Sequence, residues 1–162
     1  MLFYAEPIEF TPQAGCGAPV WLGQIAEGEG LLRFAIAVHG AGGRIAALWG
    51  EDRRREAERF RLNCVFGINQ GHVWVALDLP AQGDACPSYP DLSGIFPAAS
   101  RMQRATRDLV GIASDGGDQR PWLRHGGWPD DWFPLRHVSV HEVGVGVGFL
   151  AGEKIQRAGV AV

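Results

Sequence analysis

Residues 61–79 hold the strongest period-two alternation of apolar side chains in the chain. Apolar residues take every second position, at Leu62, Cys64, Phe66 and Ile68, and again at Val73, Val75, Leu77 and Leu79. Such alternation is typical of strands with one buried face, because successive side chains of a strand point to opposite faces. The pattern therefore predicts strands over 61–69 and 72–79, joined as a hairpin by a turn at Asn69-Gln70-Gly71.

Two more segments alternate in the same way nearer the N-terminus. Every second residue is apolar in 31–39 and in 44–50, and the glycines between them favour another hairpin. A shorter run favours a fifth strand over 91–95. We expect one sheet, with these side chains facing its helices: Phe34, Ile36, Cys64, Phe66, Val73 and Val75.

Three segments favour helices. The first, 19–26, is short, and the second is the charged run 51–59, whose leading acids suit the positive end of a helix dipole. The third covers 98–110, with Pro97 in a position tolerated at a helix start and Gly111 at its end. On this helix Ala98, Met102, Ala105 and Leu109 share one apolar stripe, and Arg101, Arg104 and Arg107 project mostly to the other side.

These elements predict an α+β domain of two layers. We expect a mixed, mostly antiparallel sheet of four to five strands with helices on one face. Residues 1–18 have little periodicity and are interpreted as an extended arm, and 19–136 as the folded domain. Residues 137–162 form a C-terminal tail whose valines and glycines fit extra strands.

Composition and charge exclude several classes of protein. The chain has 162 residues, which suits one domain, and 46% of them are hydrophobic, enough to build a core. Its net charge of −3 argues against a nucleic-acid partner, which requires a basic surface. The sequence has no apolar run of about eighteen residues and no signal-peptide pattern at its N-terminus. We therefore expect a cytoplasmic protein that does not insert into the membrane.

The cysteines and histidines argue against a metal or cluster held by this chain. Cys16, Cys64 and Cys86 are widely spaced and include no C-x-x-C pair, and Cys64 is expected to be a buried thiol. His137 and His141 stand four residues apart, but the valines around them favour a strand. In a strand these imidazoles begin about 13 Å apart, too far for one zinc ion. We expect no cofactor.

A resemblance is carried by two runs: A-A-S-R-M-Q-R-A-T-R-D-L-V-G-I at 98–112 and W-P-D-D-W-F-P-L-R at 128–136. They resemble the signature of the 30-kDa subunit family of respiratory complex I, an NADH dehydrogenase. They are closer still to the related domain of the large subunits of membrane-bound nickel-iron hydrogenases of the formate hydrogenlyase type. Six residues match the family pattern: Ala99, Arg104, Asp108, Leu109, Gly111 and Ile112. Gln103 and Ala105 stand at its two glutamates, and Arg101 at its aromatic residue.

The resemblance implies a fold of the order α-β-β-α-β-β-β and a function without catalysis. It implies a peripheral-arm subunit on the inner face of the cytoplasmic membrane. Its partners would be the catalytic large subunit, of the 49-kDa or nickel-iron hydrogenase kind, and other peripheral-arm subunits. Hydrogenase-type and quinone-type complexes remain equal alternatives.

The candidate partner-binding residues lie in the signature region. Asp108 stands four residues after Arg104, which fits an ion pair on the helix or, as the resemblance favours, a charged seam against a partner. The loop from 122 to 135 holds several large rings that must pack on this domain or on a partner. The full set of candidates is Arg101, Arg104, Arg107, Asp108, Arg124, Trp128, Trp132 and Arg136.

Two other interpretations stay open at this stage. Asp108 and His125, beside Trp122 and Trp128, would suit the pocket of a small stand-alone enzyme. The chain would otherwise be an isolated binding module that has lost its complex. The acids of the same region suit a hard cation, but solvated loop carboxylates are more common; they are Asp115, Asp118, Asp130 and Asp131.

Overall fold

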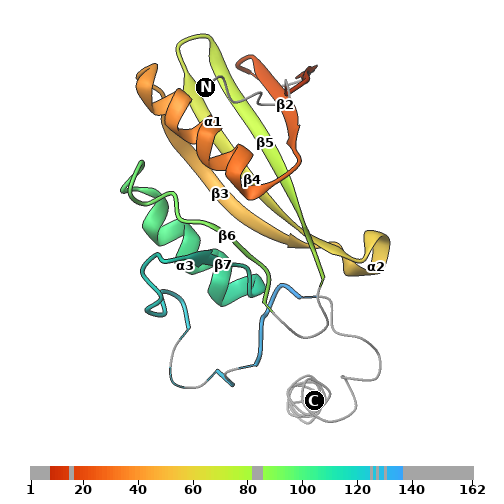
Figure 1. Cartoon of the computed structure of the whole chain (residues 1–162). Helices are drawn as coiled ribbons and strands as arrows, with labels where there is room; N and C mark the ends of the chain where they lie inside the picture. The colour runs from red at the N-terminus through yellow and green to blue at the C-terminus, as the bar shows by residue number, and fades with distance from the viewer. Residues whose placement is uncertain are drawn as a thin grey trace, which may run out of the picture.

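The computed structural model describes residues 8–14, 17–81, 86–124, 126, 128–129 and 131–136. Figure 1 shows the elements, which follow one another along the chain as β1 (Phe10–Gln13), β2 (Val20–Ile25), α1 (Gly28–Gly40), β3 (Arg44–Asp52), α2 (Arg54–Ala57), β4 (Arg59–Ile68), β5 (Gly71–Pro80), β6 (Ser88–Pro90), α3 (Ala99–Val110) and β7 (Ala113–Asp115). The longest helix of the described part, α1, has 13 residues, whereas a bilayer crossing takes about 20.

Five strands form one mixed sheet in the order β1-β2-β5-β4-β3. β2 and β5 are parallel, and the other neighbouring pairs are antiparallel. The short strands β6 and β7 form a separate parallel pair. The predicted α+β class, with a mixed and mostly antiparallel sheet, is confirmed.

The hairpin that the alternation predicts is the centre of the sheet. β4 and β5 pair antiparallel with Cys64 opposite Val75 and Phe66 opposite Val73, and all four side chains are buried. Burial in this apolar layer raises the pKa of the Cys64 thiol. The strand predicted over 44–50 is also confirmed, as β3, on the outer side of β4.

The strand predicted over 31–39 is wrong, because this segment forms α1. Leu31, Ala35 and Val38 are buried at helical spacing against the core, whereas Ile36, expected inside, is 55% exposed. The outer side of α1 also carries the apolar residues Ile36 and Ala37, so apolar residues on both sides of the helix imitate the alternation of a strand. The hairpin predicted between 31–39 and 44–50 is therefore absent.

The helix predicted over 19–26 is wrong too, because this segment is strand β2. β2 and β3 run in the same direction on either side of the β4–β5 hairpin, so the chain must cross over between them. A crossover between parallel strands takes about a dozen residues, usually as a helix, and α1 provides it. The described chain thus begins β-β-α-β, unlike the implied order.

Two smaller predictions change as well. The helix expected over 51–59 shrinks to the single turn of α2, because β3 continues to Asp52 and β4 begins at Arg59. The strand expected over 91–95 is instead a turn, in which Phe96 N–H donates to the Leu92 carbonyl at 2.8 Å. A strand does form just before it, as β6.

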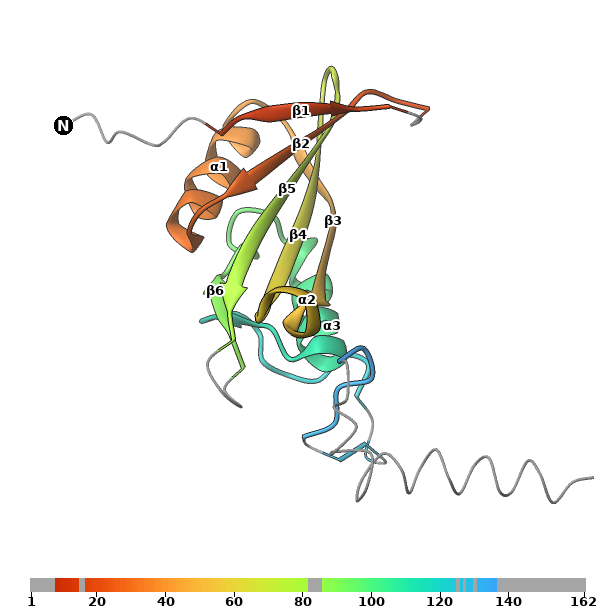
Figure 2. The ribbon, with the colours of Figure 1, turned by 90° about the vertical axis from the view of Figure 1, so that its right-hand side faces the viewer.

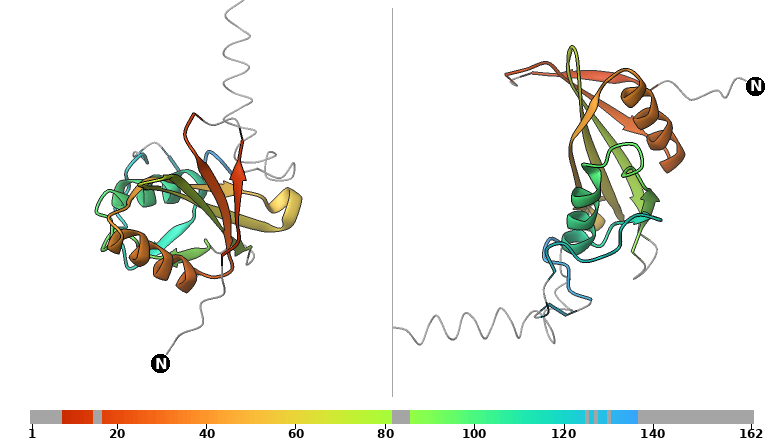
Figure 3. Two further views of the ribbon diagram at one scale, coloured as in Figure 1. Left: turned by 90° about the horizontal axis from the view of Figure 1, so that it is seen from above. Right: turned by 90° about the vertical axis from the view of Figure 1, so that its left-hand side faces the viewer.

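One hydrophobic core joins the sheet to both long helices. The Phe66 ring lies 5.5 Å from that of Phe34 on α1 and 5.7 Å from that of Phe96 before α3. Figure 2 shows the twist of the sheet, and Figure 3 shows β6 and β7 between α1 and α3. The buried apolar residues of α1 and α3 belong to the same cluster as the inward residues of the strands, so the helices cover one face.

Candidate functional site

The sequence sets both ends of α3, as predicted. Pro97 precedes the helix, and Gly111 ends it in the left-handed region, with φ 79° and its N–H 2.9 Å from the Arg107 carbonyl. A Cβ at Gly111 would collide with the Arg136 guanidinium and would lie 3.0 Å from the Phe133 ring. The C-terminal loop therefore packs directly over the end of the helix.

The buried face of α3 differs from the predicted apolar stripe. Ala98 is exposed, and Met102, Ala105 and Leu109 are only half-buried. The buried positions are Ala99, Gln103, Thr106, Asp108 and Val110. This face reaches β3 closely because Gly50 has no side chain, and a Cβ there would lie 2.7 Å from Ile112 and 3.0 Å from Thr106. Polar side chains enter this face because loops on either side supply their partners.

Gln103 shows how a polar side chain is accommodated there. Its amide oxygen accepts the Leu92 N–H at 2.9 Å, and its amide nitrogen donates to Asp91 at 2.6 Å. Burial alone would raise the pKa of Asp91, but the hydrogen bonds from Gln103 and Ser93 outweigh it and the pKa is lowered. A glutamate at position 103 could not donate to Asp91, so the glutamine suits this turn.

Two of the predicted arginines hold the chain's own loop. Arg104 donates to the carbonyls of Arg120 and Pro121, each at 2.7 Å, and pairs with Asp118 at 3.3 Å. Arg107 donates to the carbonyl of Gln119. The sequence suggests that these arginines bind a partner. In the structure they instead donate to backbone carbonyls of the chain's own loop.

Asp108 holds the same loop through its amides. One carboxylate oxygen accepts the N–H groups of Trp122, Leu123 and Arg124 at 2.7, 2.6 and 3.1 Å. Burial alone would raise the pKa of Asp108, but these backbone hydrogen bonds outweigh it, so the pKa is lowered. Asp108 and Arg104, both described by the structure, form no ion pair with each other, because each side chain binds the loop instead.

Trp122 is placed on the outside of this arrangement. The guanidinium groups of Arg101 and Arg104 lie 5.1 and 5.2 Å from its ring centre, so two cations flank one indole. The side chain nevertheless stays 42% exposed. Trp122 is thus held in a fixed position with much of its ring available for contact.

The following aromatic residues cluster around Arg124. Its guanidinium donates to the Trp132 carbonyl at 3.2 Å and lies 5.2 Å from the Phe133 ring. The rings of Trp128 and Trp132 meet edge to face at 5.2 Å, and both residues are half-buried. The predicted folding back of this loop is therefore seen in its described residues.

Arg136 fastens the loop to the C-terminal end of α3. It donates to the Val110 carbonyl at 2.7 Å, and its guanidinium lies 4.0 Å from the Phe133 ring and 5.2 Å from the Phe60 ring. A cation suits this end of a helix, where the last carbonyls lack partners. Beside it, the Leu135 N–H donates to the Leu109 carbonyl at 3.0 Å.

The structure brings all eight candidates together around α3, but gives most of them internal roles. Sequence reasoning missed Gln103 and Asp91 as a connecting pair, and it missed the exposure of Leu135, which is 57%. Leu135 lines a surface pocket with the end of β3 and with Glu56 of α2. Within the described ranges no group of three or more His, Cys, Asp or Glu could hold a metal. His125, Asp130, His137 and His141 lie outside them.

Comparison with known proteins defines the class of this chain. The family described as "Respiratory-chain NADH dehydrogenase, 30 Kd subunit" matches residues 28–141. The chain belongs to this family, and so to a class of complex-I-like respiratory-complex subunits. The predicted resemblance is confirmed.

A curated relative shares sequence with part of this chain. The chain is 29% identical over 101 residues to formate hydrogenlyase subunit 5 of Escherichia coli (strain K12). The match takes in 61% of this chain but only 18% of that protein, so the chain spans about a fifth of its length. The likeness is thus to one part of a much larger subunit.

Solved structures share the fold. A chain of the membrane-bound sulfane sulfur reductase, an archaeal respiratory membrane complex, superposes with a TM-score of 0.63 at 17% identity, covering 78% of this chain and 75% of that one. The trypsin-resistant fragment (1–134) of Nqo5 superposes with a TM-score of 0.53 at 15% identity, covering 66% and 86%. At these identities the likeness concerns the fold.

Proposed function

We propose that this chain is a non-catalytic, peripheral-arm subunit of a complex-I-like NADH:quinone oxidoreductase or a membrane-bound hydrogenase, and that it binds the catalytic large subunit. The observation that carries the proposal is the family match, which includes the whole of α3 and its loop. It supports a role among subunits whose partners hold the redox cofactors. As a peripheral subunit it would lie on the cytoplasmic side of the membrane.

The contact is made by the α3–loop surface, which we define as Arg101, Trp122, Trp128, Trp132 and Leu135. Arg101, Trp122 and Leu135 are exposed along α3, and the two other tryptophans are half-buried. Tryptophan and arginine are the residues that contribute most to binding when an interface covers them. An exposed leucine and a fixed, exposed indole are costly in water and are stabilised when a partner covers them.

The remaining candidates position this surface. Arg104, Arg107 and Asp108 bind the backbone of 119–124, Arg124 binds the Trp132 carbonyl, and Arg136 binds the end of α3. Because Asp108 and Arg104 hydrogen-bond to backbone groups of the loop, they fix the course of its main chain. A fixed loop loses little conformational entropy when it binds, which favours affinity.

The geometry disfavours the stand-alone enzyme. A general base works best with a pKa near the working pH, yet three N–H donors lower the pKa of Asp108. The same donors occupy one of the two carboxylate oxygens of Asp108 and hold the group in place. Asp108 therefore suits a structural role.

The test is affinity purification of the tagged full chain from mildly solubilised membranes of the native host, with mass spectrometry of the bound proteins. We expect a catalytic large subunit in a fixed ratio to the chain. The double change Arg101→Ala with Trp122→Ala should reduce that ratio about tenfold or more, as hot-spot losses do.

The matched control is Ile36→Ala, which removes an exposed apolar side chain of α1. It should leave the ratio unchanged, and both variants must melt like the parent. Recovery of the chain without any large subunit would overturn the proposal. Equal recovery with the parent and the double variant would place the contact elsewhere on the chain.

A further inference from the structure

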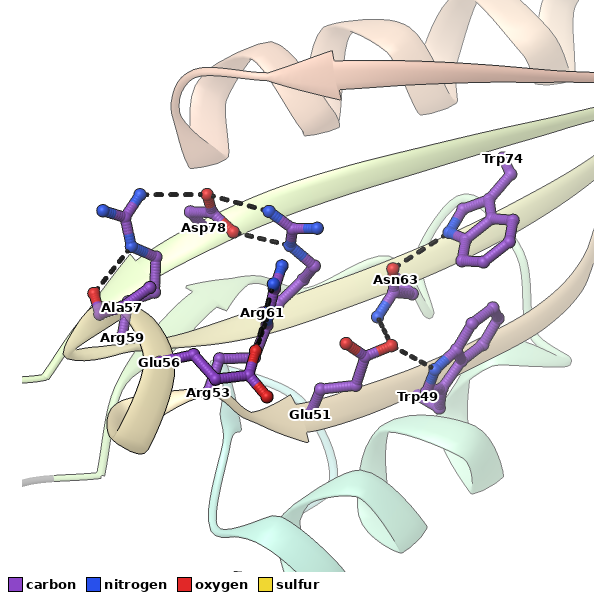
Figure 4. A network of polar contacts seen from close by, with 10 residues as sticks. All are labelled: Trp49, Glu51, Arg53, Glu56, Ala57, Arg59, Arg61, Asn63, Trp74 and Asp78. Atoms are coloured by element: carbon purple, nitrogen blue, oxygen red, sulfur yellow. Dashed lines mark hydrogen bonds and ion pairs between the residues drawn. The ribbon is translucent and has the colours of Figure 1, made fainter. Parts of the chain in front are cut away.

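The face of the sheet opposite the helices carries a pair of tryptophans. Trp49 on β3 and Trp74 on β5 lie on either side of β4, with ring centres 5.4 Å apart and planes at 52°. Both are half-buried, and neither belongs to the core cluster that packs against α1 and α3. Figure 4 shows them together on one side of the three strands.

Hydrogen bonds fix both indoles through one carboxylate. Trp74 donates its ring N–H to the Asn63 side-chain oxygen at 2.9 Å, and the Asn63 amide donates to Glu51 at 2.9 Å. Trp49 donates its ring N–H to the same Glu51 oxygen, Oε1, at 3.2 Å. Asn63 is 1% exposed, so the network has a rigid, buried base. The other Glu51 oxygen has no hydrogen bond to the described residues.

These two rings differ from three other rings of the molecule. In the described chain, Phe60, Trp122 and Phe133 each have arginine guanidinium groups within 4.0–5.2 Å of the ring centre, and Trp49 and Trp74 have none. Arg61 lies opposite Glu51 in the pairing of β3 with β4 and attracts its charge, but the Arg61 guanidinium hydrogen-bonds to Asp78, with a shortest contact of 2.7 Å. Among the described residues, no cation therefore contacts both the carboxylate and the indoles.

We propose that Trp49, Trp74 and Glu51 form a receptor site for an arginine side chain of a partner subunit. A guanidinium placed against the indoles gains cation–π attraction, and its N–H groups can donate to the open Glu51 oxygen. This contact lies on the sheet face, whereas the tryptophans of the α3–loop surface lie beside α3; Leu135 of that surface lines one pocket with Glu51. The proposal rests on the proposed function in one respect, which is that the chain is part of a complex of several subunits.

The chemistry of the site selects this occupant. A quaternary ammonium satisfies the indoles but has no N–H for Glu51, and a neutral apolar side chain has no donor for the open Glu51 oxygen. Leu22 and Val65 lie on the same open face and are half-buried, so a protein can cover more of it than a free small cation can. An arginine carried by a partner protein meets all of these conditions.

The chemistry is tested on the full chain with N-acetyl-arginine methylamide as the probe and its neutral citrulline analogue as the control. The side-chain N–H signals of Trp49 and Trp74 are followed by NMR during titration. We expect both signals to shift saturably with the arginine probe. The citrulline analogue should bind about tenfold more weakly or worse, because it lacks the charge.

Glu51→Gln is the matched variant, because its amide oxygen can still accept from Trp49 and Asn63 while its charge is gone. It should fold like the parent and lose the response to the arginine probe. Trp122, already flanked by two arginines, serves as the internal control and should not shift. No saturable shift, an equal response to citrulline, or an unchanged response in Glu51→Gln would each overturn the proposal.

The partner is tested in the assembled complex with a photo-crosslinking amino acid at Gln24, an exposed position on the same sheet face. We expect a crosslinked partner peptide that contains arginine, with a yield about tenfold lower in Glu51→Gln. A peptide without arginine, or no crosslink at all while a crosslinker at position 122 still reacts, would overturn the proposal. Loss of both crosslinks would instead mean that the chain does not assemble, which is failure of the proposed function.

Discussion

The α3–loop surface and the Trp49–Trp74 face are built from the same residue types with opposite connections. On α3, Arg104 donates to carbonyls of the chain itself. The Trp122 ring is contacted by the guanidinium groups of Arg101 and Arg104. On the sheet, a carboxylate accepts from two side chains, and the indoles have no cation in the described chain. Arg104 and Arg107 already have acceptors in the chain, whereas one Glu51 oxygen has no hydrogen bond to the described residues.

The two surfaces should therefore bind their partners in different ways, the first through apolar contacts and the second through charge. A partner of the α3–loop surface would gain mainly by covering rings and Leu135, because the donors of Arg104 and Arg107 are already bound. A partner of the Trp49–Trp74 face would gain by supplying a charge. Covered apolar area gives binding that is insensitive to salt, and a charge contact is weakened by salt when exposed.

The largest expected effect on stability comes from removing the carboxylate of Asp108 on α3. Asp108→Ala leaves the N–H groups of 122–124 without their acceptor and should lower the free energy of unfolding by about 3 kcal/mol. Denaturant melts monitored by tryptophan fluorescence measure it. Asp108→Asn, which keeps an acceptor oxygen, should cost less. Equal and small losses in both variants would mean that the loop does not depend on this carboxylate.

A smaller loss is expected where α3 meets the sheet. Gly50→Ala places a Cβ against Ile112 and Thr106, so it should move α3 away from β3 and cost about 2 kcal/mol. Thermal melting measures it, with Gly94→Ala as control, since nothing lies within 4 Å of a Cβ there. The probe response of Trp49 and Trp74 should persist in Gly50→Ala. If that response is lost instead, the two surfaces are not independent.

The pH dependence sharpens the role of Asp108 further. Its pKa is lowered in the folded chain, so its stabilisation is present above the unfolded pKa of about 3.9 and is lost as the pH falls through the folded pKa. The stability gap between the parent and Asp108→Asn should therefore be constant at neutral pH and shrink below about pH 4. Urea melts between neutral and acidic pH measure the gap, and a gap that widens in acid would contradict this sign.

The smallest effect on stability is expected from Glu51→Gln. The glutamine can keep both hydrogen bonds, so the free energy of unfolding should change by no more than about 0.5 kcal/mol. Chemical denaturation at neutral pH measures it. A large loss would make Glu51 a structural acid like Asp108, and the contrast between the two surfaces would disappear.

The sequence predicted the segments in which only one side is apolar. The β4–β5 hairpin has a buried and a polar face, so its period-two pattern has a single interpretation. α1 buries Leu31 and Ala35 yet also exposes Ile36, so its pattern fits a strand as well as a helix. β2 was hard to predict because its place depends on distant β5, with which it pairs in parallel.

The sequence predicted which residues lie at the candidate site but not what each residue binds. The sequence indicated all eight residues around α3, and they do lie together. It did not indicate that Arg104 and Asp108, four residues apart, would bind a loop more than ten residues further on. Contacts between side chains and distant backbone groups leave no periodic trace in a sequence. The Trp49–Trp74 face was missed for the same reason, since Glu51, Asn63 and Trp74 meet only through strand pairing.

Hydroxyl-radical footprinting of the free chain and of the assembled complex tests most directly whether the α3–loop surface binds the large subunit. Oxidation of each side chain is measured by mass spectrometry, with Ile36 of α1 as the internal reference. We expect Trp122 and Leu135, both exposed in the free chain, to become strongly protected in the complex while Ile36 does not. Trp122 and Leu135 oxidised at the same rate in both states would contradict binding through this surface.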